Sequence, residues 1–388
     1  MMHFWQQLPQ PFFILAPMEA VTDVVFRHVV ARAAAPDVWF SEFTNATGWV
    51  HAGEKAVGGR LLKTDDEQPI VAQIWGGEPG DMEQLAGHCR ELGYHGIDIN
   101  MGCPAKSAVK SGGSALIRQP DLAAASIAAA KTAGLPVSVK TRLGYTHVDE
   151  WHEWLAHLLR QDIVNLTIHL RTKKEMSKVP AHYELIPDIV ALRDEIAPQT
   201  LLTINGDIEN RAHGEKLLRE NPGVNGAMIG RGVFHDPFCF RKNDEWRMTN
   251  DVAKQRNNPL LSGAPAQARE RAAIDSRRSE DCLSPSKLGA SSAASIESSV
   301  GLSLSAEAVP ESKGLVSGNR KQELIHLLYL HLDLFDHYQP QLKRPFETLK
   351  RFFKIYIREF DGASELRHEL MQTKSTDEVR AVLLQYSL

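Results

Sequence analysis

The 388-residue sequence has little cysteine, no long hydrophobic run and no large excess of either charge. Its four cysteines, Cys89, Cys103, Cys239 and Cys282, form no CxxC pair and no Cys/His spacing typical of zinc, so we expect no metal. Four thiols could form two disulfides, but the N-terminus lacks a secretory signal, which favours free thiols and a cytoplasmic location. No segment approaches the run of about 18 apolar residues that a transmembrane helix needs, so we expect no membrane partner.

The overall charge excludes one class of nucleic-acid-binding protein. The formal net charge is −4 at pH 7, with 44 basic and 48 acidic side chains. Proteins that bind nucleic acid through their bulk charge are strongly basic. A polyanionic partner would therefore have to bind a local basic patch.

Over roughly its first 240 residues the chain alternates short apolar runs with amphipathic helical stretches. Runs that are apolar throughout are typical of parallel strands, and eight of them predict a (β/α)8 TIM barrel, an α/β fold. An open, doubly wound sheet is the alternative. The predicted strands are 12–16, 38–43, 70–75, 96–101, 137–141, 164–169, 201–205 and 227–230.

Beyond the barrel, predicted at 1–241, the sequence changes character twice. Residues 242–318 are rich in Ser and Ala and lack periodicity, which predicts a disordered linker or insertion. Residues 319–388 predict an all-helical C-terminal domain, with Leu-rich and Phe-rich helices at 323–335 and 345–360.

Polar and special residues follow the predicted strands at their C-terminal ends, where barrel enzymes build their active sites. Cys103 lies in a loop shaped by Gly102, Pro104 and Gly112, so we interpret it as a reactive thiol at the mouth of the barrel. An inert, partly buried cysteine is the alternative. Cys89 and Cys239 are expected to be packing residues.

Lys140 lies inside an apolar strand, where a cation is costly unless it meets negative charge. It could serve as a Schiff-base amine, as a phosphate clamp or as a charge facing a reduced flavin. A structural salt bridge is the alternative. His169 and Arg171 follow the sixth predicted strand and would add positive charge to the same mouth.

The loops after the last two predicted strands are candidates for a phosphate site. Asn205, Gly206 and Asp207 end the seventh strand, and Gly230 and Arg231 end the eighth. This is the usual phosphate position in such barrels, because glycine lets backbone N–H groups approach an anion.

Seven motifs follow or end the predicted strands: Ala16-Pro17-Met18, DINMGCPAK at 98–106, SGGSAL at 111–116, VKTR at 139–142, IHLRT at 168–172, INGD at 204–207 and MIGR at 228–231. Together they resemble the tRNA-dihydrouridine synthase family over the chain up to about residue 240. The resemblance implies an FMN-binding barrel with a C-terminal helical domain that binds tRNA. The chain differs from the commonest family pattern at Glu19, at Leu170 and along 172–180.

The resemblance also implies a reaction and its residues. Reduced FMN would add hydride at C6 of specific tRNA uridines and Cys103, as a neutral thiol, would give the proton to C5. NADPH, or NADH, is the implied reductant, and Asn100 and Arg171 are the implied contacts to the target uracil. The implied FMN-binding residues are Pro17, Met18, Glu19, Gln73, Lys140, His169, Asn205, Gly206, Asp207, Gly230 and Arg231.

One side of the helix predicted at 345–360 is basic and is the candidate tRNA surface. Arg344, Arg351 and Arg358 recur every seven residues and would share a face. A solvated helix face is the alternative. We expect the protein to act as a monomer.

Three rival functions stay open on the sequence. They are a flavin barrel that oxidises or reduces a free small molecule such as dihydroorotate, a Schiff-base aldolase that uses Lys140, and an RNA-binding module without catalysis.

Overall fold

The computed structural model describes residues 3–57, 59–109, 112–242, 320–386 and 388. The linker predicted at 242–318 lies outside the described residues from 243 onward, as does Cys282. In the described part of the chain, no helix is both long enough and apolar enough to cross a membrane.

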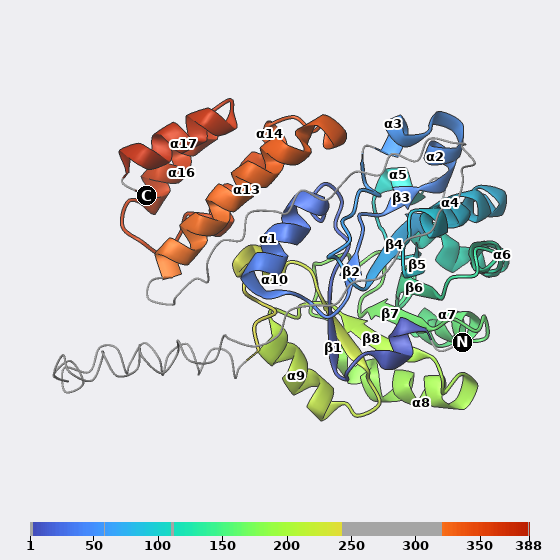
Figure 1. Ribbon diagram of the computed structural model, residues 1–388. Helices are drawn as coiled ribbons and strands as arrows, with labels where there is room; N and C mark the ends of the chain where they lie inside the picture. The colour runs from blue at the N-terminus through green and yellow to red at the C-terminus, as the bar shows by residue number, and fades with distance from the viewer. Residues whose placement is uncertain (1–2, 58, 110–111, 243–319, 387) are drawn as a thin grey trace, which may run out of the picture. The chain divides into compact units, whose positions relative to one another are not determined.

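Parallel strands form a barrel with helices around its outside (Figure 1). The strands are β1 (Phe12–Leu15), β2 (Trp39–Phe40), β3 (Thr44–Asn45), β4 (Ile70–Trp75), β5 (Gly96–Asn100), β6 (Val137–Arg142), β7 (Asn165–His169), β8 (Leu201–Asn205) and β9 (Gly226–Ile229). Their order is β1-β9-β8-β7-β6-β5-β4-β2, and a bridge from Ile14 to Val38 brings the two ends of this path together. The predicted barrel is therefore confirmed, and the open sheet is wrong.

The second predicted strand, 38–43, is interrupted in the structure. β2 ends at Phe40, β3 begins at Thr44, and both pair with β4. Between them the Gln73 backbone N–H donates to the Ser41 hydroxyl at 3.0 Å, and the buried Glu42 carboxylate pairs with Arg344. The Ser41 N–H still donates to the Val71 carbonyl at 3.0 Å, but the Gln73 N–H binds a side chain in place of a backbone carbonyl, and the regular strand is interrupted here.

Helices cover the barrel between successive strands. They are α1 (Val24–Ala34), α2 (Ala46–Ala52), α3 (Glu54–Val57), α4 (Pro79–Glu91), α5 (Lys106–Val109), α6 (Pro120–Lys131), α7 (Trp151–Leu159), α8 (Ile186–Ile196), α9 (Arg211–Glu220) and α10 (Gly232–His235). Short 3-10 helices lie at η1 (Phe4–Gln7), η2 (Gly113–Arg118), η3 (Val148–Glu150) and η4 (Tyr183–Leu185).

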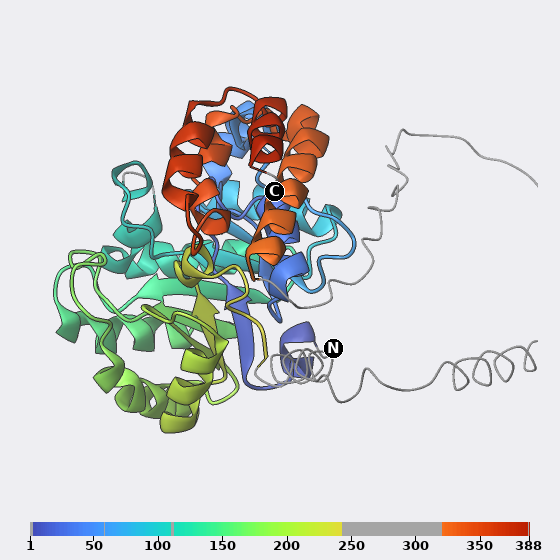
Figure 2. The ribbon, with the colours of Figure 1, turned by 90° about the vertical axis from the view of Figure 1, so that its left-hand side faces the viewer.

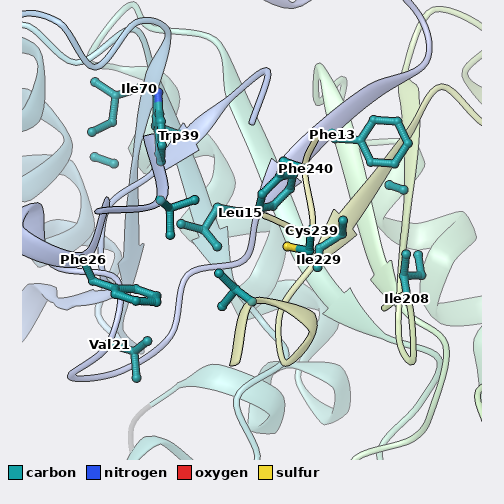
Figure 3. Packing of buried hydrophobic residues seen from close by; sticks show 14 of the residues in the cluster. Phe13, Leu15, Val21, Phe26, Trp39, Ile70, Ile208, Ile229, Cys239 and Phe240 are labelled. Atoms are coloured by element: carbon teal, nitrogen blue, oxygen red, sulfur yellow. The ribbon is translucent and has the colours of Figure 1, made fainter. Parts of the chain in front are cut away.

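The main core joins strand side chains to the inner faces of the helices. Phe13 and Leu15 of β1 and Ile229 of β9 are fully buried in one cluster with Phe26 of α1 (Figure 3). Cys239 is buried in the same cluster, and Cys89 is buried on α4. The packing role predicted for these two cysteines is confirmed, and neither forms a disulfide.

The C-terminal helices belong to the same compact unit as the barrel residues. They are α13 (Arg320–Leu342), α14 (Glu347–Lys350), α15 (Phe353–Tyr356), α16 (Ala363–Gln372) and α17 (Thr376–Gln385). The long α13 packs on α1 and α15, and α16 and α17 lie beside each other (Figure 2).

The single helix predicted at 345–360 is wrong, because this segment forms the two short helices α14 and α15. Every residue from Phe352 to Ile357 is buried except Lys354. A straight amphipathic helix buries only one stripe of side chains, so burial on several sides requires a change of direction.

Candidate active site at the barrel mouth

Every site residue predicted from the sequence lies at one end of the barrel, because the strands are parallel and the residues lie in or just after their C-terminal halves. Within the sheet, Asn100 is in register with Lys140, and His169 is in register with Asn205. Five of the predicted site residues belong to strands: Gln73, Asn100, Lys140, His169 and Asn205. The others belong to the loops that follow the strands: Pro17, Met18, Glu19, Cys103, Arg171, Gly206, Asp207, Gly230 and Arg231.

Lys140 is a half-buried cation on β6. Its Nζ donates to Asn205 Oδ1 at 3.1 Å, and Asn205 Nδ2 donates to the Met228 carbonyl at 2.8 Å. Burial, together with the nearby Arg142, lowers the pKa of Lys140 to about 8. Within the described residues it forms no salt bridge, so the structural alternative considered for Lys140 is not supported and the ammonium is available to an anionic ligand.

His169 is neutral at pH 7 in this environment. Burial lowers its pKa well below the usual value, and Arg142 and Lys140 lower it further. The expectation that His169 adds positive charge to the mouth is therefore wrong. Its Nδ1 is buried and has no hydrogen-bond partner among the described residues, so this atom is suited to bind a ligand.

The loops after β7 and β8 are tied together by Asp207. Its carboxylate pairs with Arg171, accepts from Arg231 at 2.9 Å and accepts from the Ala181 N–H at 3.1 Å. The Arg171 Nε donates to the Val179 carbonyl at 2.6 Å, while its buried Nη1 has no partner in the described part of the chain. Arg171 is thus held in place with one donor unsatisfied.

The Cys103 loop is held close to the barrel. The Cys103 N–H donates to Asn100 Oδ1 at 3.0 Å, and the Ser114 N–H donates to the Cys103 carbonyl at 3.1 Å. Gly112 has a φ of +141°, and a Cβ there would lie 2.6 Å from the Gly76 carbonyl oxygen, so only glycine fits. Burial raises the pKa of the half-buried Cys103 thiol, which therefore stays protonated at pH 7.

Met18 and Glu19 lie in the turn after β1. The Met18 N–H donates to the Thr22 hydroxyl at 2.8 Å. The Glu19 carboxylate pairs with Arg60 and is 46% exposed. A Cβ on Gly230 would lie 3.5 Å from the Ala16 Cβ and 4.0 Å from the Met18 sulfur, so the turns after β1 and β9 are in van der Waals range of each other.

Two further buried charges were given no role by the sequence reasoning. Asp98 accepts from Gln73 Nε2 at 2.7 Å and from the Ser138 hydroxyl at 2.6 Å, and burial raises its pKa to about 6. Arg142 Nε donates to the Gly102 carbonyl at 2.8 Å. A charged residue inside an apolar run, the signal that identified Lys140, was also present at Asp98.

The basic residues of the C-terminal region divide into internal and exposed groups. Arg344 donates to Asp23 at 2.8 Å, pairs with Glu42 and is 12% exposed, so its predicted place on an exposed basic face is wrong. Arg358 pairs with its neighbour Glu359 at 2.7 Å. The exposed basic residues of this segment, here called the basic patch, are Lys343, Arg351 and Lys354.

The described residues contain no group of three or more His, Cys, Asp or Glu side chains placed to hold a metal ion. Among the described residues, the mouth instead combines a half-buried cation, a neutral histidine with a free nitrogen, an arginine with an unused donor and a protonated thiol. This set is suited to a polar, anionic ligand and to proton transfer.

Comparison with known proteins identifies the family. Residues 14–273 match the family model described as dihydrouridine synthase (Dus). The chain is 49% identical over 383 residues to a probable tRNA-dihydrouridine synthase 2 of Bacillus subtilis (strain 168), with 98% of this chain and 95% of that protein covered. It is 47% identical to a probable tRNA-dihydrouridine synthase of Staphylococcus aureus (strain MRSA252), over 98% and 94% of the two chains. The chain therefore belongs to the dihydrouridine synthase family.

Proposed function

We propose that this protein reduces the C5=C6 bond of uridines in tRNA to give 5,6-dihydrouridine. The observation that carries the proposal is the near full-length similarity to probable tRNA-dihydrouridine synthases. A protonated thiol on the loop after β5 and a half-buried ammonium on β6, both at the barrel mouth, provide groups for the chemistry.

The cofactor we propose is FMN, because the family is flavin-dependent and the mouth has groups that fit it. Lys140 would face negative charge on the ring, and His169 Nδ1 and Arg171 Nη1 are buried polar atoms in need of partners. The turns at 205–207 and 230–231 would hold the phosphate. When bound, FMN supplies the two-electron reducing equivalent, and NADPH or NADH is the proposed reductant.

Cys103 would act as the general acid. Its Sγ–H bond breaks and the proton goes to C5 of the uracil, after which the thiolate takes a proton from solvent. The raised pKa keeps the proton on sulfur until the reaction needs it. Asn100, whose side chain binds the backbone of the Cys103 loop, and Arg171 are the proposed contacts to the uracil.

The tRNA would be bound partly through the basic patch. A uracil must leave its stack to reach a barrel mouth, at a cost of a few kcal/mol. Phosphate contacts can supply this free energy. Arg351 of the patch donates to the Ala20 carbonyl at 3.1 Å, which connects the patch to the turn after β1 at the mouth. A monomeric state and a cytoplasmic location stay predictions.

The test is to incubate the purified protein with FMN, NADPH and an unmodified tRNA transcript, and to detect dihydrouridine by mass spectrometry. Parallel reactions contain free uridine or dihydroorotate. Product in tRNA alone supports the proposal. Turnover of dihydroorotate without any product in tRNA would instead favour the small-molecule flavin enzyme.

A further inference from the structure

A chain of hydrogen bonds leads from a buried carboxylate to the backbone of the Cys103 loop. Asp98 Oδ2 accepts from Gln73 Nε2 at 2.7 Å, and Gln73 Oε1 accepts from Asn100 Nδ2 at 3.0 Å. Asn100 Oδ1 then accepts from the N–H groups of Gly102 and Cys103, both at 3.0 Å. Asp98 and Gln73 are fully buried and Asn100 is 6% exposed, so water does not compete for these bonds.

The two ends of this hydrogen-bond chain, Asp98 and the backbone of the Cys103 loop, determine the donor and the acceptor in every bond between them. The ionised Asp98 carboxylate can only accept, so it requires the NH2 side of the Gln73 amide. The backbone N–H groups of Gly102 and Cys103 can only donate, so they require the oxygen of the Asn100 amide. The remaining contact then joins Asn100 Nδ2 to Gln73 Oε1, with a donor facing an acceptor. Turning either amide over would place two donors or two acceptors against each other.

Residues of the neighbouring strands also bind members of this hydrogen-bond chain and hold them in place. The Ser138 hydroxyl of β6 donates to Asp98 Oδ1 at 2.6 Å, and the Gln73 N–H donates to the Ser41 hydroxyl at 3.0 Å. The charged groups nearest to Asp98 include Lys140, which favours the ionised carboxylate against its burial. Asp98 therefore lies beneath the mouth and is itself fully buried.

We infer that Asp98 is a positioning residue, whose acceptor oxygen fixes the Gln73 and Asn100 amides and, through them, the loop that carries Cys103. This inference rests on the proposed function only for the role of Cys103 as the acid. The hydrogen-bond chain itself can be tested without any substrate.

Two substitutions at Asp98 separate its acceptor from its charge. Asp98→Leu replaces the carboxylate by an apolar side chain that also branches at Cγ but cannot accept a hydrogen bond. Asp98→Asn keeps an oxygen toward Gln73, because the Ser138 hydroxyl can accept from the new NH2 group and donate to the Ile97 carbonyl, which lies 3.3 Å away. Ser138→Ala is the matched control, since it removes a different bond to Asp98 and leaves the chain to Cys103 intact.

The first readout is amide hydrogen exchange at Gly102 and Cys103 in the full-length protein, with and without FMN. We expect about tenfold faster exchange in Asp98→Leu, the change expected from losing one hydrogen bond. Asp98→Asn and Ser138→Ala should stay close to the wild type. Unchanged exchange in Asp98→Leu would overturn the inference, and so would equal acceleration in Asp98→Asn.

The second readout is kinetic and separates positioning from general destabilisation. Asp98→Leu should lower kcat for dihydrouridine formation more than it raises KM for tRNA, because the basic patch is not part of the hydrogen-bond chain and only Asn100 belongs to both the chain and the proposed uracil contacts. A rise in KM with unchanged kcat would contradict the inference. If Asp98→Leu fails to fold, Gln73→Met breaks the next link and should accelerate the same two amides.

Failure of the proposed function and failure of this inference give different results. A wild-type protein that forms no dihydrouridine would refute the proposed function. The exchange experiment would still report whether the hydrogen-bond chain from Asp98 protects the Gly102 and Cys103 amides. Conversely, the inference alone would be refuted if the wild type is active but Asp98→Leu does not change amide hydrogen exchange at Gly102 and Cys103.

Discussion

At the scale of single residues, burial determines which of the mouth residues are charged. Lys140, His169 and Cys103 all carry a pKa shifted toward the neutral form, and desolvation is the first cause in each case. At pH 7 the positive charge of the mouth therefore comes from Arg142, Arg171, Arg231 and a mostly protonated Lys140, whereas His169 and Cys103 are neutral groups suited to hydrogen bonding and proton donation.

Replacement of Cys103 separates cofactor binding from product formation. Cys103→Ala should keep FMN and its reduction by NADPH, because the thiol is not needed for either. Dihydrouridine formation should fall on the order of 10²–10⁴-fold, the usual contribution of a general acid. The measurements are the flavin absorbance spectrum and product yield by mass spectrometry.

Cys89→Ala is the matched control for this experiment. Cys89 is fully buried on α4, so its loss should lower the melting temperature and leave the product yield per folded molecule unchanged. An undiminished rate in Cys103→Ala would remove the acid role.

The shifted pKa of Lys140 predicts proton uptake when an anionic cofactor binds. In the absence of ligand its pKa is about 8, so the ammonium is partly deprotonated at pH 8.5. A bound anion favours the charged form and raises the pKa again, so binding takes up protons at this pH and FMN affinity falls as pH rises through 8. Calorimetry in two buffers with different ionisation enthalpies measures the uptake.

Lys140→Met should bind FMN more weakly and lose this part of the uptake. Equal proton uptake by Lys140→Met and the wild type would show that a different group titrates.

At the scale of secondary-structure elements, the C-terminal region is fastened to the barrel by an internal cation. Arg344 follows α13 and reaches Asp23, the residue before α1, and Glu42, the residue between β2 and β3. Burial raises the pKa of Asp23 and raises that of Glu42 to about 7, even though Arg344 lowers both. Arg344 therefore compensates two buried carboxylates at once.

Arg344→Met should destabilise the protein by about 3–5 kcal/mol at pH 8, because it leaves two buried carboxylates without their counterion. Without Arg344 their folded pKa values rise further above the unfolded ones. The folded state then binds more protons than the unfolded state, so the loss of stability should shrink as pH falls from 8 toward 5. Urea unfolding at several pH values measures this.

Arg358→Met serves as the comparison for this effect. Its partner Glu359 is 59% exposed, so the change should cost about 1 kcal/mol or less. A loss from Arg344→Met that stayed constant with pH would contradict the proposed cause.

At the scale of the whole molecule, local charge matters more than net charge. The chain carries −4 overall, yet the exposed side chains Lys343, Arg351 and Lys354 lie within twelve residues of one another in the sequence. Charge reversal at Arg351 and Lys354 should weaken tRNA binding and reduce its salt dependence, because fewer counterions are released. Fluorescence anisotropy at several salt concentrations gives both the affinity and the slope.

Lys216→Glu tests whether net charge alone explains the result. Lys216 lies on α9, outside the basic patch, and is 67% exposed. Its reversal should leave the salt slope unchanged. An equal loss of affinity in this control, or none in the patch variant, would exclude the patch from the tRNA surface.

The barrel, and the position of the candidate site residues within it, could be predicted from the sequence for a local reason. Most strands are short runs rich in apolar residues, although β3 is Thr-Asn, and each predicted site residue lies in or shortly after a predicted run. Chain order therefore places Lys140, Asn205 and the Cys103 loop at the same end of the barrel once the strands are parallel.

The partners and charge states of these residues depended on contacts between distant parts of the chain. Arg344 and Glu42 are 302 positions apart, and Asp98 meets Gln73 across 25 positions. Periodicity within one element carries no information about such pairs, because hydrogen bonds and desolvation depend on which residues packing brings together. The buried ion pairs of Arg344, the neutral His169 and the chain from Asp98 to Cys103 are therefore properties of the folded molecule.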